Sequence, residues 1–143
     1  MEKEFVPCTE ALDLKELGFN EPCLCFYNIS DDNKLAIHAQ FDSYNFNMSN
    51  NKNTPNKSSR GGKLVTISAP TFSQAFKWFI EQGILSDITP HTKNIYEFYI
   101  KYNLPFSLES DTYTYSCLSN EYKTYEEAEL ECLKKLIEIA ESK

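Results

Sequence analysis

The residues that can carry acid–base or nucleophilic chemistry are few and widely spaced. The chain has two histidines, His38 and His91, and five cysteines. A thiol becomes a strong nucleophile beside a base, so Cys117 with His91 is one pair that can be drawn. The sequences around these two residues match no hydrolase signature. A catalytic site would therefore be assembled from scattered residues such as His38, His91, Cys117 and Glu97.

The sequence Cys23-Leu24-Cys25 can be read as a metal-binding motif. On a strand, alternate side chains project to the same face, so both thiols point the same way. No second pair of ligands follows at the spacing of a zinc site. We therefore interpret the two cysteines as small core residues, and we expect neither a metal ion nor a cofactor.

Basic residues gather at one place in the chain: Lys52, Lys57, Arg60 and Lys63. They lie in or just after an Asn- and Ser-rich stretch, residues 42–62, which we predict to be a mobile surface loop. The run Arg60-Gly-Gly-Lys63 resembles a phosphate cradle, because glycine lets main-chain amides approach an anion. Its spacing is not that of a Walker loop, so a solvated loop is the simpler interpretation. Arg60 and Lys63 are still the candidate ligand- or partner-binding residues, because they lie where the loop rejoins the expected sheet.

The overall charge restricts the partners of the protein. The formal net charge is −7 and the sequence pI is near 4.8, whereas broad attraction to nucleic acid requires a basic surface. No run approaches the roughly 18 apolar residues that cross a bilayer. The first residues also lack the apolar segment of an export signal. We therefore expect a cytoplasmic protein with reduced thiols and with neither a nucleic-acid nor a membrane partner, and the oligomeric state stays open.

The C-terminal stretch, residues 124–143, is the clearest element and predicts a helix. Thr124 is a good N-cap, and Glu127 can bond back to the main-chain amide of Thr124, which would complete a capping box. Apolar residues recur at steps of three and four, which predicts one stripe packed on the rest of the protein. The stripe consists of Tyr125, Ala128, Cys132, Leu133, Leu136, Ile137 and Ala140.

Seven further elements are expected: helices between Thr9 and Gly18 and between Pro70 and Gly83, and strands at 22–29, 34–41, 63–68, 94–102 and 111–118. Strands that follow one another by short turns are typical of an antiparallel sheet with helices on one face. A chain of 143 residues is long enough to bury a core of its own. We predict an α+β fold with a mainly antiparallel sheet of about five strands, three helices, and the C-terminal helix packed across one face. The whole chain, 1–143, is expected to form a single domain.

Several short stretches at both ends and in the middle of the chain form a recognisable set. They are Glu4-Phe-Val-Pro7, Leu14-Lys-Glu-Leu-Gly-Phe19, Glu21-Pro-Cys23, Ser68-Ala-Pro70, Gln74-Ala-Phe-Lys-Trp-Phe79, Thr124-Tyr-Glu-Glu-Ala-Glu129 and Cys132-Leu-Lys-Lys-Leu-Ile-Glu138. This set resembles a family of small proteins carried by phages and prophages of gut Bacteroidales, a family without an assigned activity. The resemblance implies a small accessory protein made inside an infected bacterium. The Asn- and Ser-rich stretch before Arg60 is additional to the family pattern.

Two classes of function are compatible with these observations. The first is a non-enzymatic accessory protein that binds a host protein or a small anionic ligand, with the basic loop as part of its contact surface. The second is a small enzyme whose site is assembled from the scattered His, Cys and Glu residues. The first is favoured because the candidate catalytic residues do not cluster in the sequence.

Overall fold

The computed structural model describes residues 2–28, 34–37, 66–103, 112–116 and 121–142. The chain divides into two compact units, Met1–Thr71 and Phe72–Lys143, each with its own antiparallel sheet of three strands. The α+β class predicted from the sequence is confirmed. The single domain stays a prediction, and the loop at 42–62 lies outside the described residues.

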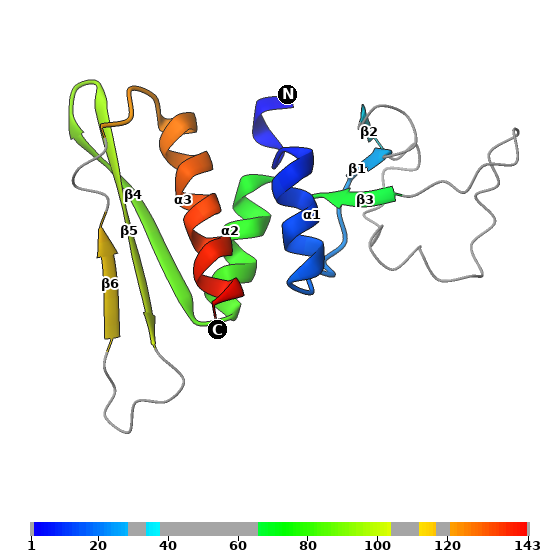
Figure 1. Ribbon diagram of the computed structural model, residues 1–143. Coiled ribbons are helices and arrows are strands. Elements are labelled where there is room, and N and C mark those ends of the chain that lie inside the picture. Colours follow the sequence, from blue (N-terminus) through cyan, green and yellow to red (C-terminus); the bar gives the residue numbers. More distant parts are fainter. Residues whose placement is uncertain (1, 29–33, 38–65, 104–111, 117–120, 143) are drawn as a thin grey trace, which may run out of the picture. The chain divides into compact units, whose positions relative to one another are not determined.

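The first unit builds its sheet from three short strands, β1 (Cys25–Asn28), β2 (Lys34–Ile37) and β3 (Thr66–Ala69). Their order is β2-β1-β3, and both pairs are antiparallel (Figure 1). β1 and β2 form the hairpin predicted from the sequence. β3 occupies the other edge of β1, and all four of its residues are buried.

Helix α1 (Cys8–Glu16) follows a short 3₁₀ turn, η1 (Glu2–Glu4), and contacts β3. The sequence predicts Thr9 as its N-cap, but the helix begins earlier and Pro7 holds the cap position without a side-chain hydrogen bond. The carbonyl of Pro7 accepts the first intrahelical bond, from the N–H of Ala11 at 2.9 Å. A proline can hold this position because it needs no main-chain N–H there.

The predicted end of α1 at Gly18 is confirmed. Gly18 has a φ of 97°, and the N–H of Phe19 donates to the carbonyl of Leu14 at 2.9 Å. This pattern is a Schellman motif, which glycine allows because it has no Cβ to clash at positive φ. The motif turns Phe19 back into the core of the first unit, whose buried side chains include Val6, Ala11, Leu14, Cys23, Cys25, Ile67 and Ala69.

Helix α2 (Phe72–Glu81) opens the second unit and is followed by Gly83 with a φ of 80°, as predicted. Its buried face differs from the predicted stripe. The spacing predicts a stripe of Phe72, Ala75, Phe76, Phe79 and Ile80, with Trp78 outside it. Trp78 is only 7% exposed, however, whereas Ile80 is 49% exposed. The indole meets Phe79 edge-on, with ring centroids 5.1 Å apart. Burying the larger ring removes more apolar surface from water than burying isoleucine, which favours the observed rotation.

The sheet of the second unit contains β4 (Ile84–Thr92), β5 (Ile95–Asn103) and β6 (Thr112–Ser116) in the order β4-β5-β6. β5 and β6 match predicted strands, whereas β4 lies in a stretch for which the sequence analysis predicts no element. The six described strands therefore form two sheets of three and not one sheet of about five. The prediction placed the strands on both sides of the helix at 70–83 in one sheet, whereas β3 pairs with β1 and β4 pairs with β5.

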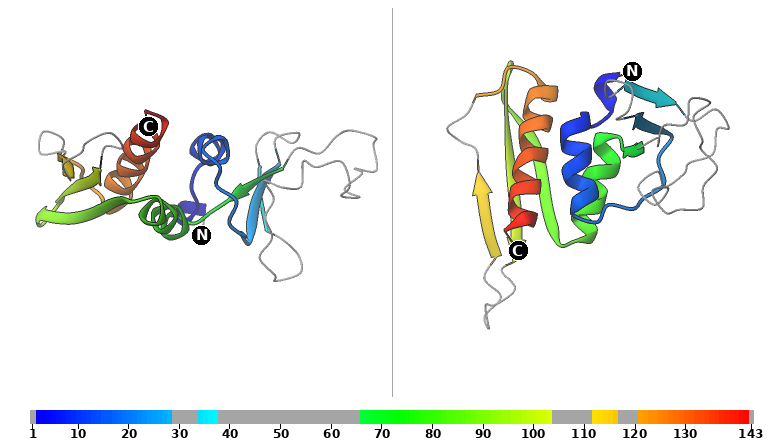
Figure 2. Two further views of the ribbon diagram at one scale, coloured as in Figure 1. Left: turned by 90° about the horizontal axis from the view of Figure 1, so that it is seen from below. Right: turned by 45° about the vertical axis from the view of Figure 1, so that its right-hand side comes forward.

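Helix α3 (Tyr125–Glu141) lies along β4 and β5 (Figures 1 and 2). Within the second unit, the predicted packing of the C-terminal helix on a sheet is confirmed. Oγ1 of Thr124 accepts the N–H of Glu127 at 3.2 Å, so the predicted N-cap is confirmed as well. The return bond differs, because Oε2 of Glu127 accepts from the N–H of Lys123 at 3.1 Å and not from that of Thr124. Of the predicted stripe, Tyr125 is 45% exposed, whereas Ile139, outside the stripe, is buried. The buried side chains of α3 are Ala128, Cys132, Leu133, Leu136, Ile137 and Ile139.

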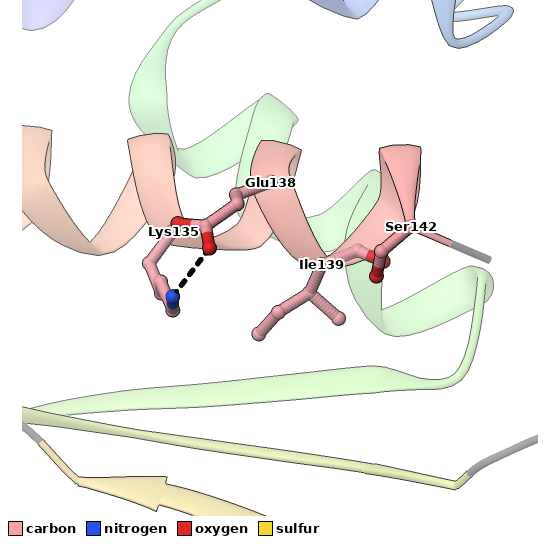
Figure 3. Close-up of polar contacts among 4 residues, drawn as sticks. All are labelled: Lys135, Glu138, Ile139 and Ser142. Atoms are coloured by element: carbon pink, nitrogen blue, oxygen red, sulfur yellow. Dashed lines mark hydrogen bonds and ion pairs between the residues drawn. The ribbon is translucent and has the colours of Figure 1, made fainter.

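The last turns of α3 carry polar contacts that stay near solvent. Nζ of Lys135 lies 2.7 Å from Oε1 of Glu138, and Figure 3 shows this ion pair beside the end of the helix. Oγ of Ser142 donates to the carbonyl of Ile139 at 2.8 Å. Exposed ion pairs of this spacing contribute about 0.3 to 0.5 kcal/mol. The buried apolar side chains of α3, and not its exposed ion pairs, therefore hold the helix in place.

Candidate functional site on the β4–β5 hairpin

The β4–β5 hairpin brings together His91 and Glu97, two of the residues that the sequence analysis names as candidates for chemistry. The antiparallel register shifts between Pro90 and Thr92, so His91 lies in a β-bulge at the end of β4. A bulge interrupts regular pairing and redirects the side chain of the additional residue. The bulge and the adjacent turn thus place an imidazole beside the first residues of β5.

Glu97 supplies a buried carboxylate to this site. Its side chain is 8% exposed, whereas that of His91 is 60% exposed. Oε2 of Glu97 accepts a hydrogen bond from the hydroxyl of Tyr99 at 3.0 Å, and Oε1 lies 3.5 Å from Nδ1 of His91. Tyr99 follows Glu97 by two residues, so both side chains project from the same face of β5. Each carboxylate oxygen therefore has a polar neighbour.

The two neighbours compensate Glu97 in different ways. Burying a carboxylate is costly unless hydrogen bonds replace those it made with water. The hydroxyl of Tyr99 does so at any pH at which it keeps its proton. A hydrogen bond to a charged group contributes about 1.5 to 3 kcal/mol. His91 adds an ion pair only while its imidazole is protonated, and its exposed position weakens that pair through solvent screening.

The carboxylate of Glu97 favours one orientation of an exposed imidazole. With Nδ1 turned toward Glu97, Nε2 lies on the opposite side of the ring, where it can donate or accept a hydrogen bond. A carboxylate that orients a histidine in this way also occurs in catalytic triads, where a nucleophile stands on the far side. Among the described residues, no group of three or more His, Cys, Asp and Glu side chains is placed to hold a metal ion.

Four predicted residues lie outside the part of the chain that the structure describes: His38, Arg60, Lys63 and Cys117. The structure thus brings together two members of the proposed catalytic set, His91 and Glu97. The roles of Arg60 and Lys63 stay predictions.

Tyr99 is the residue of this site that sequence reasoning did not single out. The alternation predicted for residues 94–102 already places Tyr99 on the same side as Glu97. An acid and a tyrosine two residues apart on a strand are therefore a usable signal for a hydrogen-bonded carboxylate. The contact with His91 could not be read from the sequence, because it depends on β4.

Cys23 and Cys25 are core residues, as predicted. They are 0% and 2% exposed, and Sγ of Cys23 donates to the carbonyl of Glu21 at 3.5 Å. Burial raises the pKa of the Cys23 thiol from 9.0 to about 12, and burial also raises the pKa of Cys25. A thiol must ionise to attack a substrate or bind a metal, so these two are unreactive at neutral pH. None of the cysteines in the described ranges, Cys8 and Cys132 included, forms a disulfide.

The first turns of α3 carry a second group of titratable side chains. Tyr125 meets Tyr96 of β5 edge-on, with ring centroids 5.9 Å apart. Burial and then the charge of Glu129 raise the pKa of Tyr125, and burial and then the charge of Glu126 raise the pKa of Glu129. Burial and like charge disfavour the ionised forms of Tyr125 and Glu129, whereas Glu126 and Glu127 in the first turn are placed where acidic side chains stabilise a helix.

The chain matches no family model, no curated protein and no solved structure with which it was compared. None of the helices in the described ranges combines the length and the apolar composition needed to cross a membrane.

Proposed function

We propose that the protein is a non-enzymatic accessory protein of a phage or prophage, and that it binds a host protein or a small anionic ligand in the cytoplasm of the infected cell. The main support is the burial of Glu97 and its hydrogen bond with Tyr99. A carboxylate that acts directly on a substrate must reach it, but this side chain is 8% exposed and already accepts the hydroxyl of Tyr99 at 3.0 Å. His91, whose side chain is 60% exposed, is held beside it. An oriented, exposed imidazole suits recognition of a partner.

Arg60 and Lys63 are the proposed contacts in the basic loop. They precede β3 by a few residues, so the sheet can restrict their direction, whereas Lys52 and Lys57 lie deeper in the Asn- and Ser-rich stretch. The formal net charge of −7 opposes a general attraction to anions. An anionic ligand or an acidic patch on a partner therefore requires a specific arrangement of cations.

The loop contacts are tested by capture from lysate of the infected host, with identification and quantification of the proteins retained. We expect Arg60→Ala with Lys63→Ala to lose the retained partner and the matched variant Lys52→Ala with Lys57→Ala to keep it. Replacement of residues 45–59 by a short Gly/Ser linker is expected to leave the fold unchanged. Full retention of the partner by the Arg60/Lys63 variant would refute these contacts.

The hairpin contact is tested in the same capture experiment with His91→Ala. Its matched control is Lys93→Ala, which changes an exposed side chain in the adjacent turn. A contact worth about 1.4 kcal/mol gives a tenfold loss of affinity. We expect a loss of this size for His91→Ala and none for Lys93→Ala, with unchanged circular dichroism for both. Equal retention by the two variants would exclude His91 from the contact surface.

A small enzyme is the second candidate, and the 3.5 Å approach of His91 Nδ1 to Glu97 Oε1 is the observation that favours it. In this reading Glu97 orients His91, Nε2 accepts a proton, and Cys117 supplies the nucleophile. Alkylation by iodoacetamide at neutral pH tests the pair directly. An enzyme of this kind predicts that Cys117 reacts faster than Cys8 and that His91→Ala slows Cys117 alone. Equal rates for the two thiols would remove this candidate.

A further inference from the structure

We draw no further inference here: the strongest candidate, the outer edge of β4 from Ile84 to Ile88, carries no proposal because nothing in the described residues shows what covers it.

Discussion

Pro90 of β4 lies opposite Tyr96 of β5, and the N–H of Tyr96 points away from Pro90 and donates to the carbonyl of Tyr122 at 2.9 Å. Two opposite residues in an antiparallel pair either bond to each other through their main-chain groups or both point these groups away from each other. The nitrogen of Pro90 therefore points to the outer edge of the sheet, where no ladder bond requires an N–H. A proline is tolerated at such a position on an edge strand.

The same alternation predicts which other positions of β4 accept proline. Ser86 lies opposite Ile100 and has the outward orientation of Pro90, whereas Asp87 lies opposite Tyr99 and bonds inward to β5. Removing an inward N–H breaks a ladder bond and leaves a carbonyl of β5 without its partner, which costs about 1 to 3 kcal/mol. We expect Asp87→Pro to lose this amount in urea unfolding and Ser86→Pro to lose clearly less. Equal losses would contradict the register.

Tyr99→Phe removes only the hydroxyl that donates to Glu97. Because the carboxylate is buried, we expect unfolding free energy to fall by about 1.5 to 3 kcal/mol, the range for a hydrogen bond to a charged group. The exposed partner, His91→Ala, is expected to cost less than about 1 kcal/mol. Chemical denaturation of Tyr99→Phe, of Glu97→Gln and of the double variant measures the coupling between the two side chains, and His91→Ala is measured beside them. A neutral Tyr99→Phe would show that Glu97 is satisfied by other groups.

Leu133 and Leu136 of α3 are both 0% exposed. Truncation of a buried leucine to alanine removes apolar contacts and leaves a cavity, which costs about 2 to 5 kcal/mol. We expect losses in this range for Leu133→Ala and for Leu136→Ala, measured by urea titration. The control is Lys134→Ala, because Lys134 lies between the two leucines in sequence on the exposed side of α3. We expect this variant to change the free energy of unfolding little. Neutral leucine variants would mean that α3 does not contribute to the core.

The N-cap of α3 can be tested at Thr124. Thr124→Ala removes the oxygen that accepts the N–H of Glu127 at 3.2 Å, and loss of such a cap costs about 0.5 to 2 kcal/mol. Thr124→Ser keeps the oxygen and is expected to retain most of the stability. Thermal and urea unfolding distinguish the two variants. If serine and alanine were equally destabilising, the hydroxyl would not be the cap.

Cys23 predicts a pH dependence for the first unit. Burial raises the pKa of its folded thiol from 9.0 to about 12, so the unfolded thiol ionises at lower pH than the folded one. The resulting stabilisation is fully present below about pH 9 and is lost as the pH rises toward 12. Cys23→Ala and Cys23→Ser cannot titrate there, so we expect both to lose stability less steeply than the native chain between these pH values. Parallel curves in a urea series over pH would contradict the burial.

The elements that the sequence predicts best are those with a strong local pattern. α3 combines an N-cap at Thr124 with a regular apolar stripe, and the ends of α1 and α2 are marked by Gly18 and Gly83. β4 was missed because its signal is tertiary. Pro90 argues locally against a strand, and only its outward position on an edge makes it acceptable.

The candidate site could be predicted only in part, because some of its contacts follow from local alternation and others depend on tertiary structure. Glu97 and Tyr99 share a face through simple alternation, so their proximity follows from the sequence of β5. Their contact with His91 depends on the register of β4 and on the bulge after Pro90, which leave no periodic trace in the sequence. A histidine in a turn-like stretch gives no sign of the carboxylate across the hairpin.

Val6 uses both of its main-chain polar groups inside the first unit. Its N–H donates to the carbonyl of Pro70 at 2.9 Å, and its carbonyl accepts the hydroxyl of Tyr27 at 2.8 Å. The segment ahead of α1 is therefore hydrogen-bonded both to the residue that follows β3 and to Tyr27 of β1. A fusion partner joined directly ahead of Val6 would strain these two hydrogen bonds, and proteolysis that removes Val6 would break them. An affinity handle for the capture experiments is better attached after Ser142, which is exposed at the end of α3.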